Sequence, residues 1–477
     1  MVVIAVILAY FILLFGIGQL TSRRASNSAF YSADHRSPWP LVAFGMVGAS
    51  ISGVTFVSVP GMVTTSQMTY LQVCLGFIVG YIVVAMVLLP LYYKLKLTSI
   101  YTYLGQRLGP TAYKTGAWFF LLSKLTGAAL KFYVVCLILQ QYIFSSFGLP
   151  FEATVLILVL FIWLYTHRGG IRTLVFTDVV QTLCLLFALI LIIYSVIQTL
   201  HLSVYGAAEA VANSSMSQIF VMDDWQSPHH FCKQFLSGVF IVIVMTGLDR
   251  DMMQKNLTCR TLRDAQKDMC TYGLAFLPVN LLFLSLGVLL TLVPSLSGMG
   301  GDQLLPAFVS QSSTAVIVLF TLGIVAASFS SADSALTALT TSYCIDIRSR
   351  SGDHRLRRNA HLTICILFAA IIIIIRYWNS PSLIDAIYTL VGYTYGPLLG
   401  LFAFGLFTHR MPIGRWVPWV CLASPLLCLM LSTLTSRYFN YQFGYELLMF
   451  NGILTFAGLW VFSTYASHEP HESHKSH

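Results

Sequence analysis

Residues 48–55 read GASISGVT and lie near the centre of an apolar run that extends from 40 to 63. The two glycines and three hydroxyl residues of this stretch lower helix propensity and favour an opening of the backbone. One interpretation is close helix packing through small residues. The other is a broken helix whose freed carbonyl oxygens coordinate a cation, while its N–H groups and hydroxyls meet a substrate.

A second polar stretch lies inside another apolar run, at 313–343, and favours the cation interpretation. Its polar residues are Ser328, Ser330, Ser331, Asp333, Ser334 and Thr337. Ala327, Ser330, Ser331 and Ser334 follow the i, i+3, i+4, i+7 spacing of one helix face, so the serine hydroxyls can lie side by side. A carboxylate inside a membrane span, such as Asp333, is costly and indicates a function.

The composition requires a lipid environment. Hydrophobic residues make up 57% of the 477 residues and charged residues only 9%. A soluble domain carries about 25% charged residues, so this chain is predicted to be an all-α integral membrane protein. Thirteen runs have spanning length: 3–20, 40–63, 70–93, 115–146, 151–166, 173–200, 230–249, 268–294, 313–343, 359–377, 384–408, 416–435 and 443–464.

The basic residues predict the orientation of these runs. With the first loop (21–39) placed inside, 22 of the 27 Lys and Arg residues, Arg250 and Lys255 among them, fall in cytoplasmic loops or the tail, and two, Arg376 and Arg437, fall outside. The other three, Lys124, Lys131 and Lys233, lie within helices. The positive-inside rule therefore predicts a multi-pass protein with its N-terminus outside and its C-terminus inside. The net charge of +9 follows from these loops and does not indicate nucleic-acid binding.

Three charged residues inside spans need partners. Asp178 lies one to two turns into the sixth span, near the cytoplasmic side, where it either guides a cation out of the protein or pairs with Arg172 or another basic loop residue. Lys124 and Lys131 are seven residues apart and share one face of the fourth span, too deep for simple snorkelling. We expect one lysine to pair with an internal carboxylate and the other to meet an anionic substrate.

Five segments in this order resemble the sodium:solute symporter family over nearly the whole chain. They are GASISGVTFVSVPG at 48–61, LYTHRGGIRTLVFTDVVQ at 164–181, GLDRDMMQKNL at 247–257, RDAQK at 263–267 and SFSSADSALTALTTSYCIDI at 328–347. The double-glycine motif continues with Ile171 and Thr173, where the family usually has another large apolar residue and a small one. The resemblance implies a sodium-coupled secondary transporter.

The resemblance also implies a LeuT-type fold with discontinuous second and seventh spans. Its expected parts are an extra N-terminal helix with the first cytoplasmic loop (1–37), a five-helix repeat (38–200), an extracellular loop (201–227), an inverted second repeat (228–410), two C-terminal helices (411–466) and a disordered cytoplasmic tail (467–477). Both binding sites are then expected between the repeats at mid-membrane depth.

The binding residues implied by the resemblance fall into three sets. The expected sodium ligands are the backbone carbonyls of Gly48, Ile51 and Ala327 and the hydroxyls of Ser330 and Ser331. Asp178, Asp333 and Ser334 mark a second sodium site or the inward exit route, and Asp333 stands where we expect a serine. Ser50, Ser52, Thr55 and Lys124 are the expected substrate contacts.

These residues favour a small organic anion as the substrate. Hydroxyls on the second span and a basic residue on the fourth resemble the sialic acid transporters. Monocarboxylates are a further anionic class. A neutral sugar remains the alternative, although Cys74 and Met245 stand where the sugar carriers place polar and aromatic contacts. A transporter-like sensor is the alternative from another class. An enzyme is not expected, because the histidines lie in loops or at span ends. We expect the chain in a bacterial cytoplasmic membrane.

Overall fold

The computed structural model describes residues 2–22, 37–95, 99–350, 352–377, 383–439, 441 and 443–465. Most of the predicted loop at 21–39 and the tail at 467–477 therefore lie outside the described residues. The first part of the fold comprises α1 (Val2–Ser22), α3 (Trp39–Ser50), α4 (Gly53–Ser66), α5 (Tyr70–Val83), η2 (Val84–Leu88), α6 (Leu89–Lys94), α7 (Thr102–Leu108), α8 (Pro110–Tyr142), η3 (Phe144–Phe147), α9 (Phe151–Thr199), α10 (Val204–Asn213) and η4 (Ser215–Ser217).

The second part of the fold is also helical, apart from one short strand pair. It comprises α11 (Phe231–Val242), η5 (Ile243–Gly247), α12 (Arg250–Asn256), α13 (Leu262–Thr291), η6 (Pro294–Leu296), η7 (Gly301–Gln303), α14 (Leu304–Ser310), α15 (Thr314–Ser342), η8 (Tyr343–Ile347), α16 (His354–Ile375), α17 (Leu383–Phe407), β1 (Arg410–Pro412), η9 (Gly414–Trp416), α18 (Val417–Phe439), α19 (Leu447–Val461) and β2 (Ser463–Tyr465). The antiparallel β1–β2 pair joins the two ends of the C-terminal helix hairpin, which the sequence did not predict.

The helices agree with an integral membrane protein. Within the described residues, nine helices are long and apolar enough to cross a membrane, and two bent helix pairs meet the same test. The helices at 151–166 and 447–461 are apolar but shorter. Each of the thirteen predicted runs corresponds to one of these segments, so the arrangement is compatible with thirteen spans. α9 contains the fifth and sixth runs. A straight helix of its 49 residues would extend about 73 Å, far beyond one bilayer.

Both predicted helix breaks are present. α3 and α4 meet at residues 51–52 with a bend of 62°, and the helix ending at Gly247 meets α12 with a bend of 70°. The small residues at 48–55 also serve packing: a Cβ atom on Gly48 would lie 1.9 Å from Thr182 Oγ1 of α9. Glycine is therefore required where α3 crosses α9. Close packing and the helix break are therefore both present, while coordination of a cation and contact with a substrate stay predictions.

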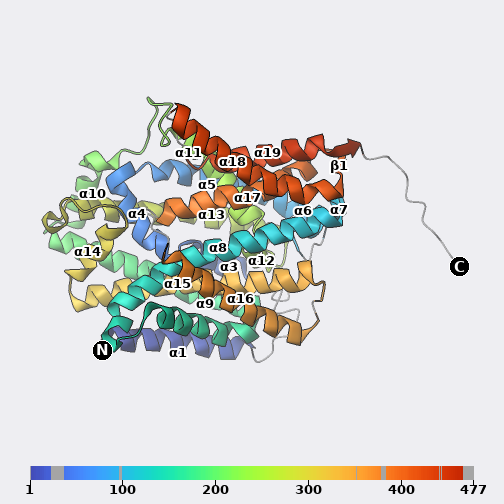
Figure 1. The fold of residues 1–477 in the computed structure, drawn as a ribbon. Helices are drawn as coiled ribbons and strands as arrows, with labels where there is room; N and C mark the ends of the chain where they lie inside the picture. The colour runs from blue at the N-terminus through green and yellow to red at the C-terminus, as the bar shows by residue number, and fades with distance from the viewer. Residues whose placement is uncertain are drawn as a thin grey trace.

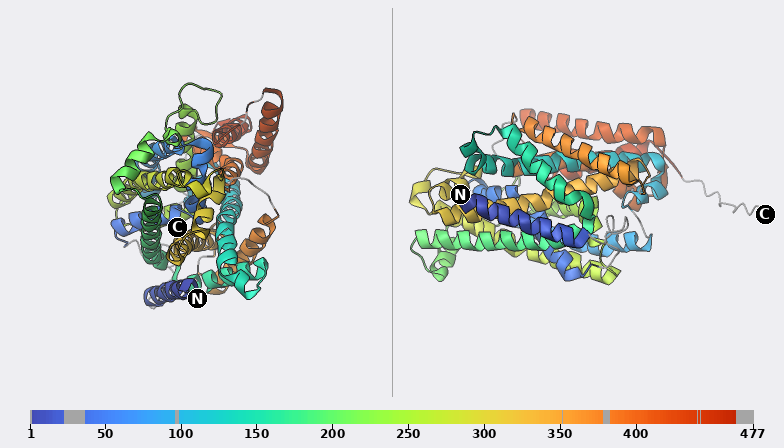
Figure 2. Two further views of the ribbon diagram at one scale, coloured as in Figure 1. Left: turned by 90° about the vertical axis from the view of Figure 1, so that its left-hand side faces the viewer. Right: turned by 90° about the horizontal axis from the view of Figure 1, so that it is seen from below.

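The broken helices lie inside the bundle, and the extra N-terminal and C-terminal helices lie on its edges. α15 packs against α9, α8 and α3, while α3 also contacts α13. In Figure 1, α1 runs along one edge of the molecule, and α18 and α19 run along the opposite edge. The left-hand view of Figure 2 also places α1 and the C-terminal helices at opposite edges. The polar residues of α3, α4, α12 and α15 are consequently shielded from the lipid by the surrounding helices.

Candidate substrate and cation site

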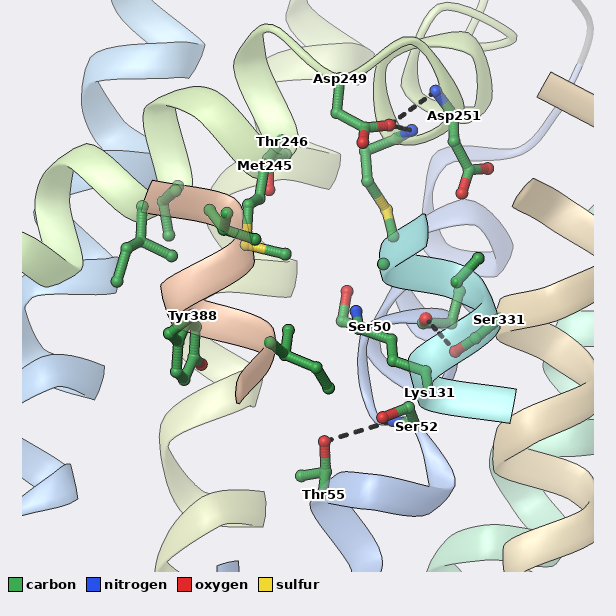
Figure 3. Close-up of a pocket in the computed structure, with 18 of the residues that line it drawn as sticks. Ser50, Ser52, Thr55, Lys131, Met245, Thr246, Asp249, Asp251, Ser331 and Tyr388 are labelled. Atoms are coloured by element: carbon green, nitrogen blue, oxygen red, sulfur yellow. Dashed lines mark hydrogen bonds between the residues drawn. The ribbon is translucent and has the colours of Figure 1, made fainter. Parts of the chain in front are cut away.

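A central cavity lies where the broken helices face α8, α13, α15 and α17 (Figure 3). Its polar lining consists of Ser50, Ser52, Thr55, Tyr70, Tyr81, Ser123, Lys124, Lys131, Thr246, Asp249, Asp251, Tyr272, Ser331, Tyr388 and Tyr395. All four predicted substrate contacts line this cavity, together with Ser331 of the predicted sodium site. The predicted substrate residues therefore share one cavity with Ser331, whereas the other predicted cation residues are not part of its lining. Their roles in binding stay predictions.

The break between α3 and α4 exposes carbonyl oxygens toward α15. The Ile51 N–H still donates to Val47 O at 3.2 Å. The next N–H, that of Ser52, instead meets Thr55 Oγ1 at 3.3 Å, so Gly48 O loses its helical donor. Ser331 Oγ donates to the neighbouring Ala49 O at 2.9 Å. This combination of freed carbonyls and a facing hydroxyl suits a monovalent cation.

The rest of the predicted cation cluster lies deeper between α9 and α15. Ser330 is fully buried and its hydroxyl donates to Asp178 Oδ1 at 2.6 Å. Ala327 is buried beside it on the same helix face. The two serines thus face different partners: Ser331 faces the α3 break and Ser330 faces the carboxylate of α9.

Asp178 has a basic partner that the sequence placed in a loop. Its Oδ2 lies 2.7 Å from Lys255 Nζ, and both side chains are buried. Of the two roles left open for Asp178, the structure shows pairing with a basic residue, and that residue comes from α12. The side chain of Arg172, the partner named from the sequence, lies outside the described residues. Nothing in the sequence around Lys255, the middle residue of QKN at 254–256, indicated that its side chain is buried against a carboxylate.

Asp333 and Ser334 lie next to this pair but keep free oxygen atoms. Asp333 Oδ2 accepts a hydrogen bond from Tyr165 at 2.8 Å. Within the part of the chain that the structure describes, Asp333 Oδ1 and Ser334 Oγ are buried and have no hydrogen-bond partner. The carboxylate is thus oriented by the Tyr165 hydroxyl, and its second oxygen remains available to a ligand.

The two lysines of α8 have different surroundings. Lys124 Nζ lies 3.1 Å from Asp249 Oδ2 and 2.8 Å from Asp251 Oδ2, so it has two carboxylate partners. Lys131 lines the same cavity but has no ion pair or hydrogen bond with any described residue. Figure 3 shows Lys131 on the same side of the cavity as Ser52 and Ser331. As expected, one lysine meets internal carboxylates, and the geometry favours Lys131 over Lys124 as the free cation.

A further buried ion pair fixes α12. Arg250 forms an ion pair with Asp346 of η8, and Tyr113 of α8 donates to the same carboxylate at 2.9 Å. Arg250 and Lys255 are only 3% and 1% exposed. The sequence counted both among the cytoplasmic loop charges, and the structure corrects this. A bend of 70° turns α12 back into the protein, which hydropathy alone does not reveal.

The hydroxyls of the broken helix are already oriented. Ser50 forms a hydrogen bond with Tyr272 of α13, whose hydroxyl also accepts from Tyr81 at 2.8 Å. Thr55 Oγ1 accepts from the Ser52 backbone. Tyr272 was missed because a tyrosine in an apolar helix carries no signal that separates packing from ligand contact. These hydrogen bonds fix the polar wall of the cavity beside Lys131.

Residues 30–413 match the sodium:solute symporter family. The chain belongs to this family. It is 27% identical to the sodium/sialic acid symporter NanT of Aliivibrio fischeri, over 81% of this chain and 79% of that protein. It is 24% identical to the sodium/sialic acid symporter SiaT of Proteus mirabilis, over 87% and 86%.

Solved structures support the same fold. A substrate-bound, outward-open Na+-coupled sialic acid symporter superposes with a TM-score of 0.81 at 20% identity, and the match covers 97% of each chain. Mhp1, a nucleobase-cation-symport-1 family transporter, superposes with a TM-score of 0.62 at 15% identity, over 92% and 94%. The predicted LeuT-like fold is thereby confirmed. As a member of the sodium:solute symporter family, this protein is a sodium-coupled secondary transporter and not an enzyme. The boundaries of the two repeats remain a prediction.

We predict that Lys124→Met lowers the stability of the protein rather than its selectivity for anions. The change leaves Asp249 and Asp251 buried without their cation, and breaking a buried ion pair from one side costs about 3–5 kcal/mol. Thermal unfolding of the purified protein without substrate measures this loss. Lys114→Met, at an exposed lysine of the same helix, is the matched control and should unfold as the wild type does.

The sequence-based hypothesis gives the opposite result. If Lys124 binds the substrate carboxylate, Lys124→Met leaves thermal stability unchanged and weakens anionic ligands far more than neutral ones. That outcome would return Lys124 to the substrate site.

Proposed function

We propose that this symporter imports a small carboxylate-bearing organic anion, sialic-acid-like or a monocarboxylate, together with sodium. The observation that carries this proposal is Lys131. Its ammonium group lines the central cavity without an ion pair among the described residues, whereas Lys124 in the same cavity has two. A free cation in a low-dielectric cavity creates a demand for an anionic ligand.

The polar wall of the cavity, which carries the hydroxyls of the broken helix, completes the proposed substrate site. Ser52 and Thr55 stand at the start of α4, where the backbone N–H groups of a helix N-terminus favour negative charge. Lys131 and this helix end therefore attract the same end of the ligand. Ser50 and Tyr272 supply further hydrogen-bonding groups for a hydroxylated substrate. The sialic acid substrates of NanT and SiaT combine a carboxylate with several hydroxyls, which suits this wall.

The proposed sodium site explains the coupling. Its ligands are the carbonyls of Gly48, Ile51 and Ala327 and the hydroxyls of Ser330 and Ser331. Sodium at the α3–α4 break holds in place the same turn that presents Ser52 and Thr55 to the substrate. Binding of either ligand then favours binding of the other by the same factor. Each sodium that enters at 100 mV contributes about 2.3 kcal/mol from the potential alone.

We also propose the bacterial cytoplasmic membrane as the location, with the N-terminus outside. The strong bias of Lys and Arg toward one set of loops supports this orientation. The burial of Arg250 and Lys255 removes two residues from the cytoplasmic count but leaves the bias intact.

Ligand-dependent thermal stability tests the proposed function. The purified protein is heated with a panel of small acids and sugars, each in sodium and in potassium, because a ligand of the native state raises its apparent stability by mass action. We expect stabilisation by a carboxylate, and only in sodium. The amide of the same compound is the matched neutral ligand and should have little effect.

Two outcomes would contradict the proposal in different ways. Sodium-dependent stabilisation by a neutral sugar, without any by acids, would keep sodium coupling and remove the anion. Stabilisation by a carboxylate to the same extent in potassium and sodium would keep the anion site and remove the proposed sodium site.

A further inference from the structure

We infer that a groove between the starts of α8 and α18 binds one anionic phospholipid of the cytoplasmic leaflet. One wall of this groove lies within residues 110–119 of α8, and Pro418 and Leu422 of α18 form the other. The groove shares no residue with the lining of the central cavity. The inference therefore goes beyond the proposed function and uses only its orientation, in which both helices start at the cytoplasmic side.

The α8 wall of the groove changes from polar to aromatic along the helix. Thr111, Lys114 and Thr115 come first, and Trp118 and Phe119 follow one turn later. These positions have the i, i+3, i+4, i+7, i+8 spacing of one helix face. The helix rises about 10 Å from Thr111 to Trp118. A ligand that fills the groove must therefore be polar at one end and apolar at the other, as a phospholipid is.

The polar end of the groove has unused hydrogen-bond donors. Thr115 is only 8% exposed, and its hydroxyl has no hydrogen-bond partner among the described residues. Lys114 is exposed and forms no hydrogen bond or ion pair with any residue that the structure describes. α8 also starts without a side-chain cap, so the N–H groups of its first turn favour an anionic group. Together these donors suit the phosphate of a lipid headgroup.

The charge around the groove has one sign. α8 and α18 contain no acidic residue. Arg415 lies in η9, which packs against α8 just before the α18 wall begins. Arg107 of α7 donates to the Arg410 carbonyl of β1 at 3.4 Å, and Figure 1 shows α7 and β1 at the same end of the molecule. This excess of cations favours a lipid with a net negative charge over a zwitterionic one.

The groove also lies at the depth of the lipid headgroups. The predicted spans begin at 115 and 416, so Lys114 and Arg415 each precede a span directly. The exposed side chains of Trp118 and Trp419 follow within about one turn, as is typical of the membrane interface. Leu422, which is also exposed, continues the apolar end of the groove. A phosphate beside Lys114 thus directs an acyl chain along Trp118 and Leu422.

Lipid binding to the purified protein, stripped of lipid in detergent, tests the inference. Native mass spectrometry measures the binding of palmitoyl-oleoyl phosphatidylglycerol, which is anionic, and of the phosphatidylcholine with the same chains, which is zwitterionic. We expect the wild type to bind one phosphatidylglycerol at least 5-fold more tightly than phosphatidylcholine. Lys114→Met should weaken phosphatidylglycerol about 5-fold, which is about 1 kcal/mol for one basic residue, and leave phosphatidylcholine unchanged.

Two further variants separate the groove from general surface charge. Lys94→Met, at an exposed lysine that ends α6, should bind both lipids as the wild type does. Thr115→Val keeps the shape of the groove and removes its buried hydroxyl, so it should also weaken phosphatidylglycerol. Without lipid, Lys114→Met should unfold at the wild-type temperature, because Lys114 has no partner among the described residues.

Three outcomes would overturn the inference. The first is equal affinity of the wild type for the two lipids. The second is an equal loss of phosphatidylglycerol in Lys114→Met and Lys94→Met, which would show that only the overall positive charge matters. The third is displacement of the lipid by an equal concentration of glycerol 3-phosphate, which would show a site for soluble anions. None of them affects the proposed sodium and substrate sites, which lie in other parts of the fold.

Discussion

Ser331→Ala is expected to raise the sodium concentration for half-maximal uptake about 30-fold while the protein remains folded. The hydroxyl faces the α3–α4 break, 2.9 Å from Ala49 O, and alanine removes one of the five proposed ligands. An interaction between a hydroxyl and a charged group is worth about 2 kcal/mol, which corresponds to about 30-fold in affinity. Initial uptake rates over a series of sodium concentrations measure the change.

Ser328→Ala is the matched control for this prediction. Ser328 lies on the same helix and is buried, but its hydroxyl has no hydrogen-bond partner among the described residues and is outside the proposed ligand set. We expect its sodium dependence to match that of the wild type. Unchanged sodium dependence in Ser331→Ala would remove the assigned site, and an equal change in both variants would indicate a general packing effect of α15.

The sequence predicted the features that depend on neighbours along the chain. The bend at residues 51–52 follows from the low helix propensity of glycine and serine, and the break is tolerated in an apolar run because its backbone is buried in protein. The shared face of Ser330 and Ser334 follows from helical spacing, whereas their burial follows from the packing of helices on all sides of α15. Spans, breaks and the polar face of α15 were therefore accessible from local pattern and from the resemblance.

The pairing of charges was not accessible in the same way. Lys124 and Lys131 lie on one helix face, and nothing in their spacing shows which of them meets Asp249 and Asp251. The position of α12, which folds back after a bend of 70°, determines which lysine pairs with these carboxylates. The same bend takes Lys255 from an expected loop to Asp178, which is 77 residues earlier in the sequence. Side chains that meet across distant segments leave no periodic signal, so their partners appear only in the fold.

Lys131→Met is expected to weaken binding of a carboxylate substrate about 30–100-fold and to change binding of its amide little. Lys131 lines the cavity without an ion pair among the described residues, so its loss leaves no buried carboxylate unpaired. The loss is confined to the charge-assisted contact with the ligand, worth about 2–3 kcal/mol. Displacement of a bound radioactive substrate by the acid and by its amide measures the two affinities.

Lys131→Arg separates charge from shape at this position. Because the guanidinium keeps the positive charge, this variant should retain most of the preference for acid over amide even if its absolute affinity falls. An equal loss for acid and amide in Lys131→Met would show that Lys131 shapes the cavity and does not bind the anion. The carboxylate would then have to be recognised by the hydroxyls and N–H groups at the start of α4 alone, and Ser52→Ala would carry the larger effect.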